Sequence, residues 1–233
     1  MGTIFSEQSN PEINQVAFFD LDRTITGAVS GRLLVTGAYR RGLMKKSDIL
    51  LALWLSSAYR LKLRDPVAIM NEMIIWVKGI KVSDFSALCS EVVNEDLIPS
   101  VFKEAAAEIG LHKGNNVRTV LLSSSVGQVC REISAHLGIK DIICSELEAS
   151  EGLLTGLPLG NLCFGEEKAR RLTKYCEYHN YSPDNAWYYG DSISDLPALS
   201  IVGNPVCVNP DRQLEKEAFR RGWKICRWKQ SAK

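Results

Sequence analysis

Residues 16–24 read VAFFDLDRT, an apolar run that leads into two aspartates. Val16–Asp20 is apolar at every position except its last, as expected for a parallel strand that is covered on both faces. In an open parallel sheet, ligands bind beyond the carboxyl ends of the strands. Asp20 and Asp22 therefore stand where a functional site is expected.

A long helical stretch and then an alternation of strands and helices follow this segment. Residues 30–94 contain little glycine and carry apolar residues at helical spacing. From residue 95 the two kinds of segment alternate, which predicts an α/β fold with a three-layer, doubly wound parallel sheet. We expect residues 1–28 and 95–233 to form this core and residues 29–94 to form an inserted α-helical cap. The later strands are expected at Val117–Leu122, Asp141–Ser145, Ala186–Tyr189, Val206–Val208 and Lys224–Cys226, the core helices at Pro99–Ile109, Val126–Leu137, Glu166–His179 and Arg212–Arg221, and a hairpin at Leu153–Leu159.

The composition is that of an ordinary globular protein. Hydrophobic residues make up 45% of the 233 residues, and the formal net charge is +1. This balance predicts neither nucleic acid nor an anionic membrane as a partner. The apolar window Ile49–Leu55 is far shorter than the roughly 20 residues that span a bilayer. Met1–Asn10 lacks the pattern of a signal peptide, and the seven cysteines form no CxxC pair, so we expect reduced thiols in a cytoplasmic protein.

Polar residues that are suited to catalysis lie at the ends of several predicted elements. Two carboxylates follow the first strand, hydroxyls follow the second, and two more carboxylates follow the strand at 186–189. An ammonium group lies near the start of the helix at 166–179. A parallel sheet brings such ends together at one edge. These residues are Asp20, Asp22, Ser123, Ser124, Asp191, Asp195 and Lys168.

This set of side chains suits phosphoryl transfer. A phosphate monoester repels an attacking carboxylate, and Mg²⁺ held by one or two carboxylates, here Asp20 and Asp191, would neutralise that charge. Lys168 would add a fixed positive charge, and Ser123 would donate a hydrogen bond to phosphate. Residues i and i+2 of an extended chain point the same way, so Asp20 and Asp22 can face one substrate. One carboxyl would attack phosphorus while the other protonates the leaving oxygen.

The order of these residues resembles the motifs of the haloacid dehalogenase superfamily of phosphatases. The helical segment between the first two motifs resembles the cap of the phosphoserine-phosphatase-like branch, subfamily IB with a helical C1 cap, and the resemblance covers nearly the whole chain. The core of that family is Rossmann-like. Its motifs DxDx(T/V), a strand ending in Ser or Thr, a lysine, and GDxxxD correspond here to Asp20, Asp22 and Thr24, then Ser123, then Lys168, and finally Gly190, Asp191 and Asp195.

The resemblance implies a role for each matched residue. Asp20 is implied as the nucleophile, which forms an aspartyl-phosphate, and Asp22 as the general acid/base. Ser123 and Lys168 are implied to bind phosphate, and we expect Ser124 beside them to contribute.

The resemblance also implies a Mg²⁺ ion. Its ligands are implied to be the carboxylates of Asp20 and Asp191 and the backbone carbonyl of Asp22. Asp195 is implied to lie behind the ligands without binding the ion itself, or to help position the water molecules that the metal binds.

The predicted function is thus a Mg²⁺-dependent phosphomonoester hydrolase for a small phosphorylated metabolite. True phosphoserine phosphatases carry a glutamate shortly after the first motif, but Ile25–Leu34 contains no acid, which argues against phosphoserine. Three alternatives stay open: a phosphotransferase that uses the same intermediate, a non-catalytic binding protein of the same fold, and a membrane-associated protein that uses residues 49–55. The sequence leaves the oligomeric state open.

Overall fold

The structure is a computed structural model that describes residues 3–4, 15–61 and 63–229. Most of Met1–Asn10, on which the prediction of no signal peptide rests, lies outside this part. The strands are β1 (Thr3–Ile4), β2 (Val16–Phe19), β3 (Arg118–Val126), β4 (Asp141–Ser145), β5 (Leu147–Ser150), β6 (Leu153–Pro158), β7 (Ala186–Gly190), β8 (Asn204–Val208) and β9 (Lys224–Cys226). The α-helices are α1 (Ser30–Arg40), α2 (Lys46–Arg60), α3 (Pro66–Glu72), α4 (Val82–Val92), α5 (Lys103–Gly114), α6 (Gly127–Leu137), α7 (Glu166–His179), α8 (Leu196–Leu199) and α9 (Arg212–Arg221).

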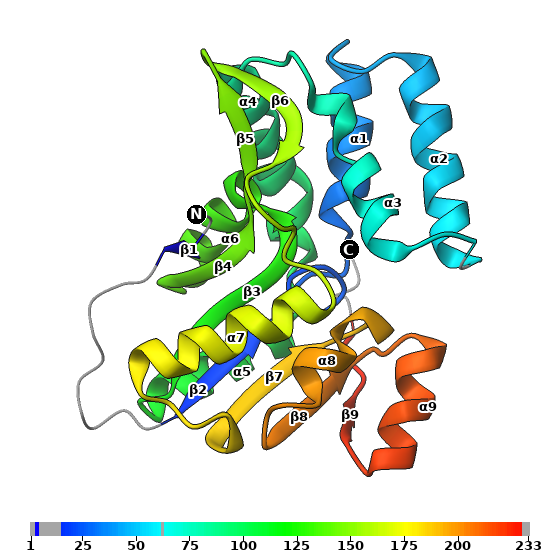
Figure 1. Cartoon of the computed structure of the whole chain (residues 1–233). Helices are drawn as coiled ribbons and strands as arrows, with labels where there is room; N and C mark the ends of the chain where they lie inside the picture. Colours follow the sequence, from blue (N-terminus) through cyan, green and yellow to red (C-terminus); the bar gives the residue numbers. More distant parts are fainter. Residues whose placement is uncertain (1–2, 5–14, 62, 230–233) are drawn as a thin grey trace.

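The centre of the described chain is a sheet in the order β1-β4-β3-β2-β7-β8-β9 (Figure 1). The strands from β4 to β9 in this order run parallel, and β1 pairs antiparallel with β4 at the edge. From β2 the chain first adds β3 and β4 on one side, and it later crosses to add β7, β8 and β9 on the other. The predicted doubly wound parallel sheet is confirmed, and β2 lies at its topological switch point.

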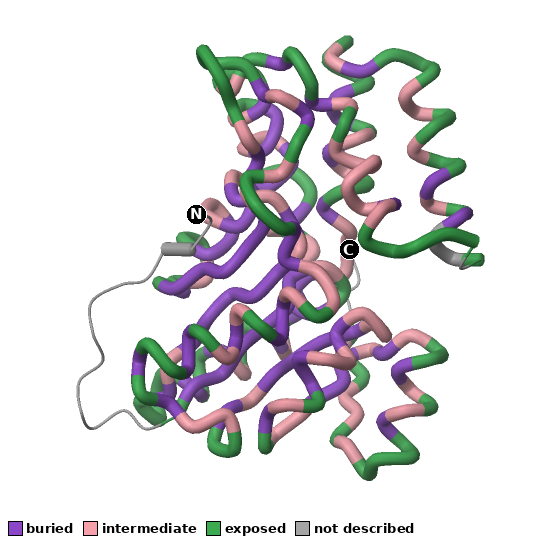
Figure 2. The backbone as a smooth tube through the Cα atoms, viewed as in Figure 1, coloured by how far each residue is buried: buried purple, intermediate pink, exposed green. Residues whose placement is uncertain are grey.

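The apolar run of β2 is buried because helices cover both faces of the sheet. Ala17 and Phe19 belong to one hydrophobic cluster, with side chains of α5 and α6. Val16 and Phe18 belong to the other, with side chains of α7, α8 and α9. Successive side chains of a strand point to opposite faces, so a strand in the middle layer must be apolar at every position. Figure 2 shows the buried strands between the two more exposed helical layers.

Helices α1 to α4 are inserted between β2 and α5, as the sequence predicts for a cap. Side chains of α1 and α4 belong to the same hydrophobic cluster as one face of the sheet. Leu55 and Ala58 of α2 form a small separate cluster with Ile69 of α3. The exact division of the chain at residues 28/29 and 94/95 stays a prediction. No helix in the described part of the chain has the length and apolarity needed to cross a membrane.

The hairpin is longer than predicted and joins the cap. It starts at Leu147, and its strands turn at Glu151 and Gly152, which both have positive φ, as a two-residue type I′ turn requires. The N–H of Gly79 donates to the carbonyl of Leu154 at 2.8 Å, and the N–H of Leu154 donates to the carbonyl of Ile80 at 2.9 Å. Backbone hydrogen bonds therefore join the β5–β6 hairpin of the core to the segment between α3 and α4.

Several other boundaries differ from the prediction, and two of the differences have a visible cause. Helix α5 begins at Lys103, because Ile98–Ser100 forms a short 3₁₀ helix before it. Strand β3 continues to Val126. Its pairing with β4 is irregular after Leu122, but β3 pairs with β4 again at Val126. The serines at 123–125 therefore lie within the end of a strand rather than in a loop beyond it.

The cysteines are all free thiols, six of them buried. This agrees with the predicted reduced state.

Candidate active site

Strand register brings two of the predicted aspartates to the same edge of the sheet. Phe19 of β2 pairs with Tyr189 of β7, so the residues after them, Asp20 and Gly190, are also level. The N–H of Asp20 donates to the carbonyl of Tyr189 at 2.9 Å. Asp191 then follows Gly190 at the same edge. Both carboxylates thus emerge at the carboxyl ends of adjacent strands beside the switch point.

Lys168 of α7 reaches into this edge from the helical layer. Its Nζ donates to Asp20 Oδ1 at 2.7 Å and to Asp195 Oδ1 at 2.6 Å. The lysine is 2% exposed. Burial acts to lower its pKa, but the charges of Asp195 and Asp20 outweigh burial and hold the pKa of Lys168 well above its usual range. The ammonium therefore keeps its charge.

Asp195 is held from several directions. Its Oδ1 also accepts from the Tyr188 hydroxyl at 2.8 Å, and its Oδ2 accepts from the N–H of Ser192 at 3.2 Å. Burial acts to raise the pKa of Asp195, but Lys168 and these donors hold it below its usual range. The close fit needs glycine at 190, since an added Cβ there would lie 2.9 Å from Asp195 Cγ.

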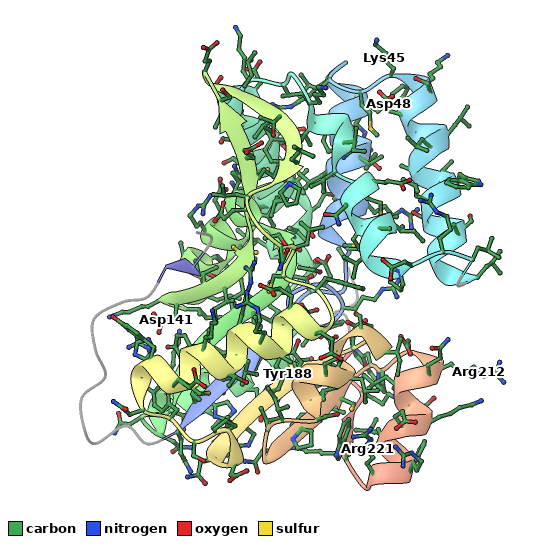
Figure 3. The ribbon with its side chains drawn as sticks, viewed as in Figure 1. Lys45, Asp48, Asp141, Tyr188, Arg212 and Arg221 are labelled. Carbon is green, nitrogen blue, oxygen red and sulfur yellow. The ribbon has the colours of Figure 1, made fainter. Side chains whose placement is uncertain are left out.

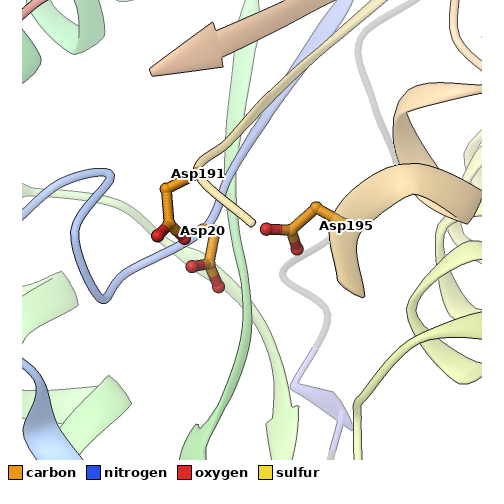
Figure 4. Close-up of side chains that lie close together, drawn as sticks. All are labelled: Asp20, Asp191 and Asp195. Atoms are coloured by element: carbon orange, nitrogen blue, oxygen red, sulfur yellow. The ribbon is translucent and has the colours of Figure 1, made fainter. Parts of the chain in front are cut away.

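Three buried carboxylates converge beside this lysine. Oxygens of Asp20, Asp191 and Asp195 lie within 4.8 Å of one another, as Figure 4 shows. Burial raises the pKa of Asp20 to about 7 and that of Asp191 to about 9, and the negative charge of Asp195 acts in the same direction on both. One ammonium does not balance three carboxylates. Oxygen donors with excess negative charge are the donor set of a hard divalent cation, so these residues fit Mg²⁺.

Asp22 faces a separate group of hydroxyls. Its carboxylate accepts from the Ser30 N–H at 2.9 Å and from the Ser30 hydroxyl at 2.8 Å. The Ser30 and Ser125 hydroxyl oxygens are 2.6 Å apart, and the Ser125 N–H donates to Ser123 Oγ at 3.2 Å. Burial raises the pKa of Asp22 despite these hydrogen bonds. A carboxyl with a raised pKa is suited to exchanging a proton.

The structure thus brings most of the predicted residues to one edge of the sheet, in two linked groups. Asp20, Asp191, Asp195 and Lys168 form the charged group, and Asp22 lies with the serines of β3. Ser123 is fully buried and Ser124 is half-buried. Sequence reasoning missed the partners that orient these groups. They are Ser30, Ser125, Tyr188, Ser192 and Asp211, whose N–H donates to the carbonyl of Asp191 at 2.7 Å.

Some of these partners carried a sequence signal. Ser192 stands three residues before Asp195, the spacing of a capping pair, which the structure forms. Ser30 lies in the first turn of α1 but eight residues from Asp22, and Tyr188 is one of two adjacent tyrosines on β7. The sequence spacing alone therefore does not indicate that Ser30 contacts Asp22 or that Tyr188 contacts Asp195.

Fold and site together define an α/β protein with a carboxylate–lysine centre at the switch point of its sheet. A model of the haloacid dehalogenase-like hydrolase family matches residues 17–200. The chain belongs to this family, and the family predicted from the motifs is confirmed.

Known proteins similar to the chain include phosphatases. A probable phosphatase of Mycobacterium tuberculosis is 29% identical over 92% of this chain and 76% of its own length. A histidinol-phosphatase of Neisseria meningitidis is 32% identical over 60% of this chain and 64% of its own length. A substrate-bound phosphoserine phosphatase is 13% identical, with a TM-score of 0.72 over 95% of this chain and 96% of that one. The last likeness concerns the fold alone.

Proposed function

We propose that this protein is a Mg²⁺-dependent phosphomonoester hydrolase that works through an aspartyl-phosphate on Asp20. The observation that carries the proposal is the position of Asp20. Its carboxylate accepts a hydrogen bond from the buried Lys168 and lies within 4.8 Å of two further carboxylates, while Asp22 stands two residues away. This arrangement would supply a nucleophile, a fixed positive charge, metal ligands and a proton donor at one edge of the sheet.

The first chemical step needs two carboxyl groups in different protonation states. An Asp20 oxygen attacks phosphorus and the ester P–O bond breaks, while the leaving oxygen takes a proton from Asp22. In the second step Asp22 accepts a proton from a water that attacks the phospho-aspartate, which releases phosphate and restores Asp20. The raised pKa of Asp22, which burial causes, supports the assignment of this residue as the acid.

Asp20 and Asp191 are the proposed carboxylate ligands of Mg²⁺, with the backbone carbonyl of Asp22 as the third protein ligand. A bound Mg²⁺ would neutralise charge on the phosphate and on its attacking carboxylate. Asp195 is assigned a supporting place, because Lys168 and Tyr188 already occupy its Oδ1. It holds the ammonium of Lys168 against Asp20 rather than binding substrate.

Lys168, Ser123 and Ser124 are the proposed phosphate-binding residues. Lys168 has three N–H donors. Once Asp20 is esterified, the N–H that donates to Asp20 can donate to a phosphoryl oxygen instead. Ser123 is held at the strand end by the Ser125 N–H, at 3.2 Å from its Oγ, so its own hydroxyl proton is free to turn towards phosphate.

The proposed substrate is a small phosphorylated metabolite. The relatives include enzymes named for histidinol phosphate and phosphoserine. Residues 25–34 provide no carboxylate for a substrate ammonium, and Ser30 in that stretch is engaged with Asp22. We therefore favour an ester other than phosphoserine.

Phosphate release from a panel of phosphomonoesters tests the proposal, with native protein, Asp20→Asn and the control Asp184→Asn, an exposed position. The panel includes phosphoserine and histidinol phosphate, each with and without Mg²⁺. We expect turnover that needs Mg²⁺, is kept by the control and is lost in Asp20→Asn. Equal turnover by native protein and Asp20→Asn would rule out Asp20 as nucleophile. A new phosphoester on addition of alcohols would indicate transfer instead of hydrolysis.

A further inference from the structure

The outer face of α2 is apolar and exposed. Leu50, Leu53 and Trp54, with Leu61 just after the end of the helix, recur at the spacing of one helix face and are 52–68% exposed. The exposed Ser57 lies in the same stripe. The inner face of the helix is apolar too, since Leu55 packs on α3. Exposed apolar side chains that gather on one surface mark a site of contact with another protein or a membrane. Much of α2 is exposed in Figure 2, at the edge of the molecule furthest from α7.

The apolar face continues beyond the end of α2. Leu63 is 67% exposed, and Val67 at the start of α3 is 50% exposed. The guanidinium of Arg64 lies 5.7 Å from the centre of the Trp54 ring. Exposed apolar side chains thus follow one another along α2 and into α3, with Ser57 among them and a tryptophan near the middle. We call residues 50, 53, 54, 61, 63 and 67 the outer apolar face.

The segment that carries this face is rich in basic residues, of which Arg41 and Arg64 pair with Glu91 and Glu72. Residues 40–64 contain seven Lys and Arg and a single acid, Asp48, in a chain whose net charge is only +1. Lys46 lies one helical turn before Leu50, at the end of the exposed stripe. Arg40, Lys45 and Lys46 are exposed and form no ion pair with any other described residue. Figure 3 shows Lys45 at the end of the cap that is remote from Tyr188 in the core.

We propose that the outer apolar face is a docking surface for a membrane that contains anionic phospholipids. A helix that lies in a membrane interface buries leucine and tryptophan side chains and places Lys and Arg near the headgroups. Tryptophan is enriched at that depth because its ring is amphipathic. Anionic lipids complement Arg40, Lys45 and Lys46, the exposed basic residues before and at the start of α2. Charge therefore favours an anionic membrane as the occupant of this face.

The proposal concerns association with the surface of a bilayer and not insertion across it. It differs from the expectation drawn from the net charge, because the positive charge is concentrated around one exposed helix. It is independent of the catalytic assignment. A full-length Asp20→Asn protein should bind vesicles as the native protein does, so the two proposals can fail separately.

Cosedimentation with vesicles tests the docking surface. Full-length protein is mixed with vesicles of phosphatidylcholine alone or of phosphatidylcholine with phosphatidylglycerol. We expect binding to the anionic vesicles, weakened by salt, and little binding to the neutral ones. Leu53→Glu with Trp54→Glu should lower the partition coefficient about tenfold or more, because two apolar side chains would lose their burial. Lys45→Glu with Lys46→Glu should lower it to a similar extent on anionic vesicles.

Matched controls make the result decisive. Phe219→Glu removes another exposed apolar side chain, 72% exposed on α9, and should keep native binding. Unchanged turnover of a soluble phosphomonoester, or an unchanged melting temperature, shows that each variant is folded. No binding of native protein to anionic vesicles overturns the proposal, as does equal binding by native protein and the Leu53→Glu, Trp54→Glu variant. A native dimer that this variant dissociates, without vesicle binding, would instead assign the face to a second copy.

Discussion

The ammonium of Lys168 lies 2.7 Å from the carboxylate of Asp20, although 147 residues separate them in the chain. The same ammonium contacts Asp195, so one lysine holds two carboxylates in a buried site. We expect Lys168→Met to lower kcat by about 10²–10³-fold, since it removes a fixed positive charge from the transition state. Phosphate release measured beside Lys174→Met, an exposed lysine of the same helix, checks this. Similar losses in both variants would contradict it.

Removal and return of Mg²⁺ should change the stability of the protein. A cation that binds only the folded state stabilises it by about 2.7 kcal/mol at a concentration of 100 times its Kd. We expect Mg²⁺ added after EDTA to raise the melting temperature of native protein but not that of Asp191→Asn. Asp184→Asn should respond as native protein does. An equal rise in Asp191→Asn would mean that Asp191 is not a ligand.

Gly190 has no room for a side chain. A Cβ there would approach Cγ of Asp195 and the Tyr188 ring to 2.9 Å, so Gly190→Ala must displace one of them. We expect a loss of roughly 1–3 kcal/mol in the free energy of unfolding, together with a fall in kcat because Asp195 no longer holds Lys168 in place. Urea unfolding and phosphate release measure the two effects. Gly110→Ala on α5, where an added Cβ meets no atom within 4 Å, is the control that should show neither.

The hydroxyl of Ser30 should matter most when the leaving group needs a proton. Ser30→Ala removes the donor at 2.8 Å from Asp22 and leaves the backbone donor in place. We expect kcat for an alkyl phosphate to fall roughly tenfold, and kcat for p-nitrophenyl phosphate, whose leaving group departs as an anion, to change little. Ser30→Thr should restore the alkyl rate. Equal losses on both esters would mean that Ser30 does not act through Asp22.

His112 should make the fold sensitive to mild acid. It is buried, and its Nε2 lies 2.8 Å from the Tyr189 hydroxyl. Burial lowers the pKa of His112, helped by Lys224 and opposed by Glu108. The unfolded chain therefore binds a proton more readily, so stability is present above the unfolded pKa of about 6.5 and is lost as pH falls towards the folded pKa.

Urea unfolding at about pH 7.5 and about pH 5.5 tests this dependence. His112→Gln should lose less stability between the two pH values than native protein does. His179 keeps its own contribution of the same sign, because burial lowers its pKa too. His136→Gln, at an exposed position, should keep the native pH dependence. The same loss in His112→Gln and native protein would show that His112 does not contribute.

Much of the fold follows from local patterns. Helices at Glu166–His179 and Arg212–Arg221 and strands at Asp141–Ser145 and Lys224–Cys226 have the predicted bounds. Continuous apolar runs identify strands that are covered on both faces, and the glycine that ends α9 identifies its terminus. Two of the larger errors fall where strand pairing overrides local preference. An irregular ladder extends β3 past Leu122, and pairing lengthens the hairpin back to Leu147.

For the site, the sequence by itself determined the identity and order of the candidate reacting groups, because each follows a recognisable strand or opens a recognisable helix. Only the tertiary structure decided which of them touch. The contacts of Ser30 with Asp22 and of Tyr188 with Asp195 depend on where α1 and β7 pack, and no sequence spacing encodes that. The sequence likewise could not show which face of α2 is exposed. Hydrophobic periodicity shows which side chains share a helix face, but the packing of the other elements decides which face is left uncovered.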